Sequence, residues 1–371
     1  MKKLRCVVVT NVPTPYRLPI WDILADSGDV DLHVVYCAGA HIDPSKDGRS
    51  SKYGVHFLEG EYTAYENRFA HADWSVTRLL DQLKPDVVVT SGFIPTFLYA
   101  FAWSVWRGVP HVVMTDGTLE SEQGLSWVHR LVRRVVFART RAFIGACLAG
   151  RDLFASYGVR KDSIFVSPLC IDNDHFGRHG AMPRPYDFLY CGRYIERKNP
   201  LFALRVAKGV AERLGRKVTF RCVGKGAMEP ELRQLAQELA PWVDVSFTGY
   251  KSQEELPLEY ASSKIFMFPT TMEPWGVVVN EACAAGTPTV STPHTGVAGE
   301  LIIDGVSGFI CELDEGSWVA RCATLLSDGE VWTRCSDGAK AQVKNYTFAH
   351  AATGFLNAVR FAAAGGKGSP R

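Results

Sequence analysis

The sequence lacks a strong excess of charge of either sign, since 41 lysines and arginines stand against 39 aspartates and glutamates. The formal net charge of +2 predicts no strong attraction of the whole chain to nucleic acid. Hydrophobic residues make up 47% of the chain and charged residues 22%, which excludes a disordered protein. A length of 371 residues favours two hydrophobic cores over one.

Paired cysteines are also missing. The chain has ten cysteines, but none forms a CxxC pair, which a zinc site would favour. A disulfide framework is typical of much smaller, cysteine-dense secreted chains. We therefore expect reduced, mostly buried thiols in a cytosolic protein, and no metal site.

Long apolar helices are not indicated either. The uncharged stretch Val87–Trp106 is interrupted by Ser91, Gly92 and Pro95, whereas a spanning helix needs about 20 continuous helical residues. We predict strand, loop and helix there. The apolar run near the N-terminus stops at Thr10, too early for a signal peptide, and is predicted to be a first buried strand. No GxGxxG motif follows that strand, which argues against an NAD-dependent dehydrogenase.

What the sequence does have is a repeated alternation of short β-branched runs and helix-length segments, which predicts α/β domains with parallel sheets. The pattern restarts after a polar stretch with Pro183 and Pro185. We predict an N-terminal Rossmann-like domain over residues 1–176, a linker over 177–186 and a second domain over 187–347. Ligands of such sheets bind beyond the carboxyl ends of the strands.

The strongest motif runs from Glu273 through Pro274 and Gly276 to Glu281. It predicts a strand, a loop and then a helix over residues 276–285, whose free N–H groups can meet an anion. Two carboxylates near one helix start can accept hydrogen bonds from paired sugar hydroxyls. Solvated helix acids are the alternative, and the arrangement of both acids around the glycine argues against it.

A second motif, Gly192-Arg193 followed by Lys198, comes directly after the first strand of the second domain. A glycine bend there lets the backbone turn, and the two cations can bind a phosphate, the arginine bidentately and the lysine as a point charge. An ordinary charged loop is the alternative interpretation of this motif.

Together these motifs resemble glycosyltransferase family 4, the retaining, nucleotide-sugar-dependent enzymes of GT-B fold. The resemblance covers most of the chain and is densest over residues 187–311. It implies two Rossmann-like domains whose parallel sheets face a central cleft, with a C-terminal helix over 348–364 completing the first domain. It also implies transfer of a hexose from a UDP- or GDP-linked donor with retention, and without a metal or other cofactor.

The same resemblance implies site residues. Arg193 and Lys198 would hold the donor diphosphate, Glu281 the ribose hydroxyls and Glu273 the transferred sugar. Further donor-binding positions are Gly192, Gly224, Gly249, Tyr250, Lys251, Gly276, Val277 and Val278.

The N-terminal half departs from the family. The loop after the first strand, residues 11–17, has no glycine and resembles a bacterial subset with Pro-Tyr-Arg at this point. We expect the acceptor near Tyr16, Arg17 and Glu120, and a glycan or lipid-linked acceptor of bacterial surface polysaccharide or glycolipid biosynthesis. Asp116 stands where family members often have a histidine; it is assigned a catalytic role, with a turn-forming aspartate as the alternative.

Five arginines recur at helical spacing among apolar residues between Trp127 and Arg141. A basic amphipathic helix can lie on an anionic membrane, which would make the protein peripheral on the inner membrane face through Arg130, Arg133 and Arg134. A core-packed helix with a solvated basic face is the alternative.

Other functions remain open beside sugar transfer. An epimerase or hydrolase of the same fold would share the motifs. A nucleotide-binding protein without catalysis would keep the phosphate loop, but it would not need both Glu273 and Glu281.

Overall fold

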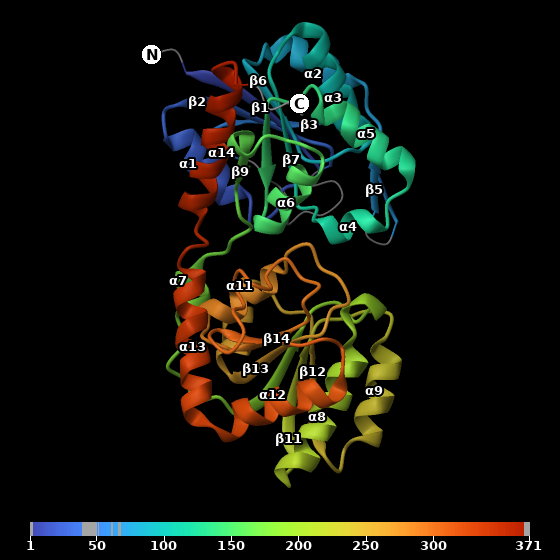
Figure 1. The fold of residues 1–371 in the computed structure, drawn as a ribbon, viewed down its shortest axis with the longest axis vertical. Helices are drawn as coiled ribbons and strands as arrows, with labels where there is room; N and C mark the ends of the chain where they lie inside the picture. The colour runs from blue at the N-terminus through green and yellow to red at the C-terminus, as the bar shows by residue number, and fades with distance from the viewer. Residues whose placement is uncertain (1–2, 39–49, 51, 61, 66–67, 367–371) are drawn as a thin grey trace. The chain divides into compact units, whose positions relative to one another are not determined.

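The computed structural model describes residues 3–38, 50, 52–60, 62–65 and 68–366. The chain forms two compact units (Figure 1): unit 1 comprises residues 1–169 and 348–371, and unit 2 comprises residues 170–347. Each unit is an α/β domain with a parallel sheet, so the predicted fold class is confirmed.

Unit 1 is built on a seven-stranded sheet of order β3-β2-β1-β6-β7-β8-β9, in which every neighbouring pair is parallel. Its central strands β1 and β6 contain buried valine runs, as expected for a sheet covered on both faces. The strands are β1 (Leu4–Thr10), β2 (Val30–Tyr36), β3 (Gly54–Phe57), β6 (Val87–Thr90), β7 (His111–Thr115), β8 (Ala142–Gly145) and β9 (Ile164–Val166).

Helices cover both faces of this sheet (Figure 1). α1 and α14 pack together through an edge-to-face contact of Trp21 with Phe355, whose ring centres are 5.2 Å apart. α2, α3 and α5 lie on the other face. The helices are α1 (Leu18–Asp26), α2 (Ser75–Leu83), α3 (Pro95–Arg107), α4 (Leu119–Gln123), α5 (Trp127–Phe137), α6 (Leu148–Ser156) and α14 (Phe348–Ala363); β4 (Tyr62–Tyr65) and β5 (Arg68–His71) form a separate antiparallel pair.

Unit 2 has a six-stranded parallel sheet of order β12-β11-β10-β13-β14-β15. The strands are β10 (Tyr186–Cys191), β11 (Val218–Val223), β12 (Val243–Gly249), β13 (Ser263–Phe268), β14 (Thr289–Ser291) and β15 (Gly308–Ile310). The helices are α7 (Asn173–Gly177), α8 (Pro200–Leu214), α9 (Glu229–Glu238), α10 (Leu256–Ala261), α11 (Val277–Ala284), α12 (Glu315–Ser327) and α13 (Gly329–Val343), with the 3₁₀ turn η3 over Glu196–Lys198.

The segment between the predicted domains differs from the sequence-based boundaries. Unit 2 begins at Cys170, because α7 packs on α10 and α11. Residues 177–186, predicted to be a linker, are tied into unit 2 by Arg184, whose guanidinium donates to Ser263 O at 2.6 Å, Ala285 O at 2.7 Å and Thr287 Oγ1 at 2.8 Å. The C-terminal helix α14 belongs to unit 1, where the family resemblance places it.

The uncharged stretch Val87–Trp106 forms β6, a loop and α3, as predicted. Among the helices of the described residues, none combines the length and hydropathy needed to span a membrane.

Candidate active site

The helix start predicted after β13 is present and depends on a glycine. Gly276 caps α11 with φ +112°, a left-handed conformation that residues with a Cβ rarely adopt. A Cβ at this position would also lie 2.9 Å from the Phe268 ring. Val277 and Val278 are the first two residues of the helix, so their backbone N–H groups lie at its N-terminus. Both residues are half-buried. A tight turn therefore connects the strand end to α11.

Glu273, just before this turn, is bound by two cations. Lys198 Nζ donates to Glu273 Oε2 at 2.5 Å, and Arg197 Nη1 donates to the same oxygen at 2.6 Å. Lys198 also lies 5.0 Å from the centre of the Phe268 ring. Burial raises the pKa of Glu273, but the Lys198 ammonium and the Arg197 guanidinium outweigh it, and the net shift is downward. Glu273 is therefore held as a carboxylate, with its orientation set by two donors.

The same environment acts on the lysine. Burial and the nearby charges of Arg197 and Arg193 lower the pKa of Lys198, and the net shift is downward although the Glu273 carboxylate acts in the opposite direction. The Lys198 side chain is 15% exposed. A partly desolvated ammonium interacts more strongly with an incoming anion than one in water, so this lysine is suited to a phosphate.

The loop that carries these cations, residues 192–199, is held on both sides. The Tyr190 hydroxyl lies 3.0 Å from Arg193 O and 3.3 Å from Lys198 O, and it donates to these carbonyls. On the other side Gly224 packs so closely that a Cβ there would lie 2.0 Å from Gly192 O. The backbone of the predicted phosphate loop is thus fixed, while the Arg193 side chain is exposed.

Glu281, on α11, is in a different environment from Glu273. Its carboxylate is 4% exposed and accepts a hydrogen bond from the Tyr260 hydroxyl at 2.7 Å. Burial raises the pKa of Glu281 to about 7, although the Tyr260 hydrogen bond acts in the opposite direction. The two acids of the motif therefore differ in their surroundings. Glu273 is ion-paired with two cations, whereas Glu281 is buried with one hydrogen bond from Tyr260.

This environment predicts that the contribution of Glu281 to the stability of the fold depends on pH. Because its pKa is raised on folding, Glu281 stabilises the fold below its unfolded pKa, and that contribution is lost as pH rises towards 7. The Glu281→Gln variant should therefore gain stability relative to wild type by up to about 3 kcal/mol between pH 4.5 and pH 8. Urea unfolding of both proteins across this range measures the difference; a difference that does not change with pH would contradict it.

The predicted base-binding turn, Gly249–Lys251, follows β12. Gly249 has φ +70°, and Tyr250 is 77% exposed. Lys251 Nζ pairs with Glu255 Oε1 at 2.8 Å. The turn at Gly249 therefore leaves the Tyr250 ring exposed to solvent.

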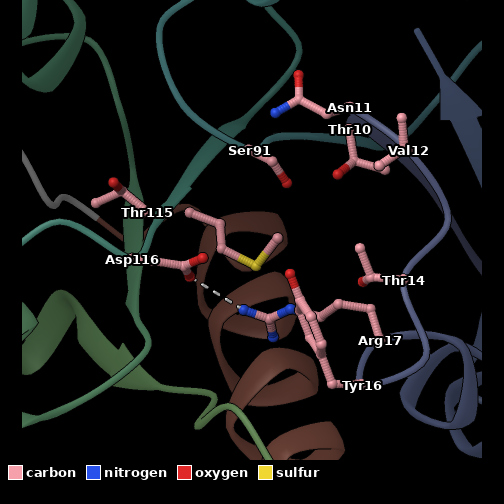
Figure 2. A pocket seen from close by; sticks show the side chains of 10 residues that line it. Thr10, Asn11, Val12, Thr14, Tyr16, Arg17, Ser91, Thr115 and Asp116 are labelled. Atoms are coloured by element: carbon pink, nitrogen blue, oxygen red, sulfur yellow. Dashed lines mark hydrogen bonds and ion pairs between the residues drawn. The ribbon is translucent and has the colours of Figure 1, made fainter. Parts of the chain in front are cut away.

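In unit 1, the loop after β1 lines a cavity of about 320 Å³ together with residues that follow β6 and β7 (Figure 2). Tyr16, Arg17 and Asp116, named separately from the sequence, all line it. Arg17 Nη2 lies 3.4 Å from Asp116 Oδ1, and Arg17 Nη1 lies 3.3 Å from Ser167 Oγ. Glu120 lies on α4 and is not among the lining residues.

The side chains of Asn11 and Ser91 also line this cavity. Asn11 Oδ1 and Ser91 Oγ are buried, and neither has a hydrogen-bond partner among the described residues. Burial raises the pKa of Tyr16, and Asp116 raises it further, so its hydroxyl stays protonated and can donate. The cavity is therefore lined by both donors and acceptors, as a site for a polyhydroxylated molecule requires.

The basic helix α5 does not present all three of its assigned arginines. Arg133 Nε pairs with Glu122 Oε1 at 2.9 Å, and the Arg133 side chain is 12% exposed. Its guanidinium also stacks over Phe93 at 4.3 Å. Arg133 is therefore a packed residue and leaves the predicted membrane-facing set, whereas Arg130 and Arg134 are exposed.

Two buried or half-buried residues of the site were not assigned from the sequence. Arg197 lies in the same motif as Lys198, and η3 turns both side chains towards Glu273. Its positive charge next to Lys198 would have been enough to predict it as a site residue. Tyr260 lies on α10, and no sequence pattern links it to Glu281.

The fold and this arrangement define a class of protein. It has two α/β units, each with a parallel sheet, and one unit holds a carboxylate, Glu273, against the cations Arg197 and Lys198 in loops that follow strands. Comparison with known proteins identifies it. The model described as "Glycosyl transferases group 1" matches residues 172–342, and the "Glycosyl transferase 4-like domain" model matches residues 13–170. The chain belongs to the glycosyltransferases of family 4 type and has the GT-B fold.

Curated relatives include the amylovoran biosynthesis glycosyltransferase AmsK of Erwinia amylovora, 25% identical over 53% of this chain and 49% of the relative. The putative colanic acid biosynthesis glycosyltransferase WcaL of Salmonella typhimurium is 30% identical over 46% of this chain and 45% of the relative. The chain thus spans about half the length of the curated relatives it matches.

Among solved structures, Anabaena Alr3699/HepE in complex with UDP superposes with a TM-score of 0.76 at 16% identity, covering 96% of this chain and all (100%) of that one. The same Anabaena protein is also solved with UDP-glucose. At this identity the likeness shows the fold alone.

Proposed function

We propose that this protein transfers a hexose, with retention, from a UDP- or GDP-linked donor to a glycan or lipid-linked acceptor. The observation that carries the proposal is the Glu273 carboxylate, held by Lys198 and Arg197 at the start of α11. A carboxylate oriented by two cations is suited to accept hydrogen bonds from sugar hydroxyls, while Lys198 can also meet a phosphate.

The proposed chemistry is electrostatic. The leaving diphosphate gains negative charge in the transition state, and Arg193 with Lys198 stabilises the departing oxygen. The acceptor hydroxyl attacks on the same face, and its proton passes to the leaving phosphate oxygen. Because cationic side chains neutralise this charge, we propose that no bound metal is needed. Glu281 would accept hydrogen bonds from the ribose hydroxyls, and the Gly249–Lys251 turn would contact the base.

The acceptor is proposed to bind in the cavity of unit 1. Asn11 and Ser91 contribute polar side chains to its lining, and Arg17 and Tyr16 offer donors. Asp116, half-exposed and close to Arg17, is proposed to bind an acceptor hydroxyl. Surface polysaccharide or glycolipid synthesis is the proposed context, and the names of the Erwinia and Salmonella relatives support it.

A thermal-shift panel of nucleotide sugars tests donor binding, because a donor at 100 times its dissociation constant should stabilise the protein by about 2.7 kcal/mol. Product analysis with a radiolabelled donor then separates transfer from hydrolysis and epimerisation. Stabilisation without turnover on any acceptor would favour a non-catalytic nucleotide-binding protein. No stabilisation by UDP- or GDP-sugars would overturn the proposal.

We also propose that α5 docks on an anionic membrane. Its outer side exposes Trp127 (74%), Leu131 (50%) and Val135 (56%) at spacings of four residues, beside the exposed Arg130 and Arg134. Apolar side chains exposed next to arginines suit the boundary between headgroups and acyl chains. The exposed apolar ridge favours this reading over a helix with a merely solvated basic face.

Reversing Arg130 and Arg134 to glutamate should release the protein from vesicles containing phosphatidylglycerol, because each basic residue near such a surface contributes about 1 kcal/mol. Vesicle sedimentation at low and high salt is the measurement. The matched control reverses Arg213 and Lys217, two exposed basic residues of unit 2, and should sediment like wild type. Equal sedimentation of both variants, or none for wild type, would reject the membrane contact.

A further inference from the structure

A groove with aromatic walls runs between α2 and α3 of unit 1, which lie side by side in Figure 1. It has a volume of about 330 Å³, and we call it the aromatic groove. It shares no lining residue with the cavity of Figure 2. Its main lining residues are Trp74, Thr77, Asp81, Tyr99, Trp103 and Trp106.

Two tryptophans of the aromatic groove are unusually exposed, Trp74 at 64% and Trp106 at 75%. Each is nevertheless held in place. The Tyr99 ring packs edge-on to Trp74 with ring centres 4.6 Å apart, and the Arg107 guanidinium lies 4.4 Å from the centre of the Trp106 ring. Large aromatic surface left in water but fixed in orientation is typical of a binding surface.

The aromatic groove also has a polar element at Asp81. Asp81 Oδ1 accepts hydrogen bonds from Trp103 Nε1 at 3.2 Å and from Arg107 Nη2 at 2.5 Å. Among the described residues, no hydrogen bond or ion pair uses Oδ2, and the side chain is 45% exposed. The carboxylate is thus oriented by two donors, while one oxygen remains available to a ligand.

We propose that the aromatic groove binds sugar rings of an oligosaccharide outside the donor and acceptor sites. The C–H faces of the rings would stack on Trp74 and Trp106, and a ring hydroxyl would donate to Asp81 Oδ2. An acyl chain or an apolar helix fits less well, because it would bury Asp81 and Arg107 without giving the free carboxylate oxygen a donor. Aromatic walls with one oriented polar group match a ligand that has both apolar faces and hydroxyls.

Under the proposed function, such a contact would raise the effective concentration of a long glycan acceptor near the enzyme. The groove itself can be tested independently of catalysis, since its residues belong to unit 1 and the predicted donor-binding residues to unit 2.

Native gel electrophoresis through gels containing dextran, galactomannan or xanthan measures this binding as retardation of the protein. We expect at least one polysaccharide to retard the wild type. The double variant Trp74→Ala/Trp106→Ala should weaken that binding by about tenfold or more, and Asp81→Asn should weaken it to a lesser extent. Trp242→Ala, which removes an exposed tryptophan of unit 2 (40% exposed), is the control and should be retarded like wild type.

UDP thermal shifts of all variants should equal that of wild type, which separates loss of this site from loss of folding or donor binding. Retardation of the wild type by none of the three polysaccharides would overturn the proposal. Equal retardation of the double variant would also overturn it. If the double variant lost vesicle binding but was retarded like wild type, the proposal would also be overturned, because the two tryptophans would then contact a membrane.

Discussion

Replacing Lys198 by alanine is expected to lower turnover by about 100-fold or more, because its ammonium is proposed to stabilise the negative charge that develops on the leaving diphosphate. The Lys198 side chain is largely buried, 2.5 Å from Glu273 Oε2. Its removal therefore takes away a partly desolvated charge that water replaces poorly. Arg193→Ala should also lower turnover, because it removes the exposed cation of the same loop. Steady-state kinetics with a saturating acceptor measure both effects.

Lys208→Ala is the matched control for this prediction. Lys208 lies on α8 of the same unit, is 40% exposed and pairs with Glu212 at 3.0 Å. It should leave turnover unchanged, since an exposed helix pair contributes little. Wild-type kinetics in both Lys198→Ala and Arg193→Ala would reject the assignment of a phosphate-binding loop.

The second large effect is expected for Glu273→Gln. Glu273 is assigned to the transferred sugar and not to the nucleotide, so turnover should fall by about 100-fold or more while affinity for UDP or GDP changes by less than about threefold. The amide keeps the shape of the side chain but removes the negative charge that Lys198 and Arg197 hold. Calorimetric titration with the free nucleoside diphosphate, beside steady-state kinetics, separates the two quantities.

Glu254→Gln controls for a general loss of acidic charge in unit 2, because that side chain is 79% exposed. It should behave as wild type in both measurements. If Glu273→Gln instead abolishes binding of the free nucleoside diphosphate while leaving residual turnover normal, the assignment of Glu273 to the sugar is wrong.

The fold class could be predicted because it depends on local patterns. Parallel sheets are specified by buried valine runs, such as those of β1 and β6, that are separated by helix-length segments. The edge strand β3 was not predicted, because its four residues are half-buried or exposed and lack the apolar run of a central strand. The start of unit 2 was also placed too late, since α7 is short and only its packing on α10 and α11 assigns it there.

The candidate site was predictable to the extent that its residues lie in short motifs. Glu273, Gly276 and Glu281 share one strand–loop–helix segment, and Lys198 follows a strand directly, so spacing alone brings them to strand ends. Arg133 shows the opposite case. Its place in a basic helix suggested a surface role, but its pairing with Glu122 depends on how α4 and α5 meet.

The sequence by itself determined the parallel α/β units, the glycine-dependent helix start and the family resemblance, because each resides in residues close together along the chain. Only the tertiary structure decided that Arg197 joins Lys198 on Glu273, that Tyr260 meets Glu281, and that Tyr16, Arg17 and Asp116 line one cavity. These contacts join residues far apart in sequence. Their geometry follows from strand order and side-chain packing, which no local pattern of residues contains.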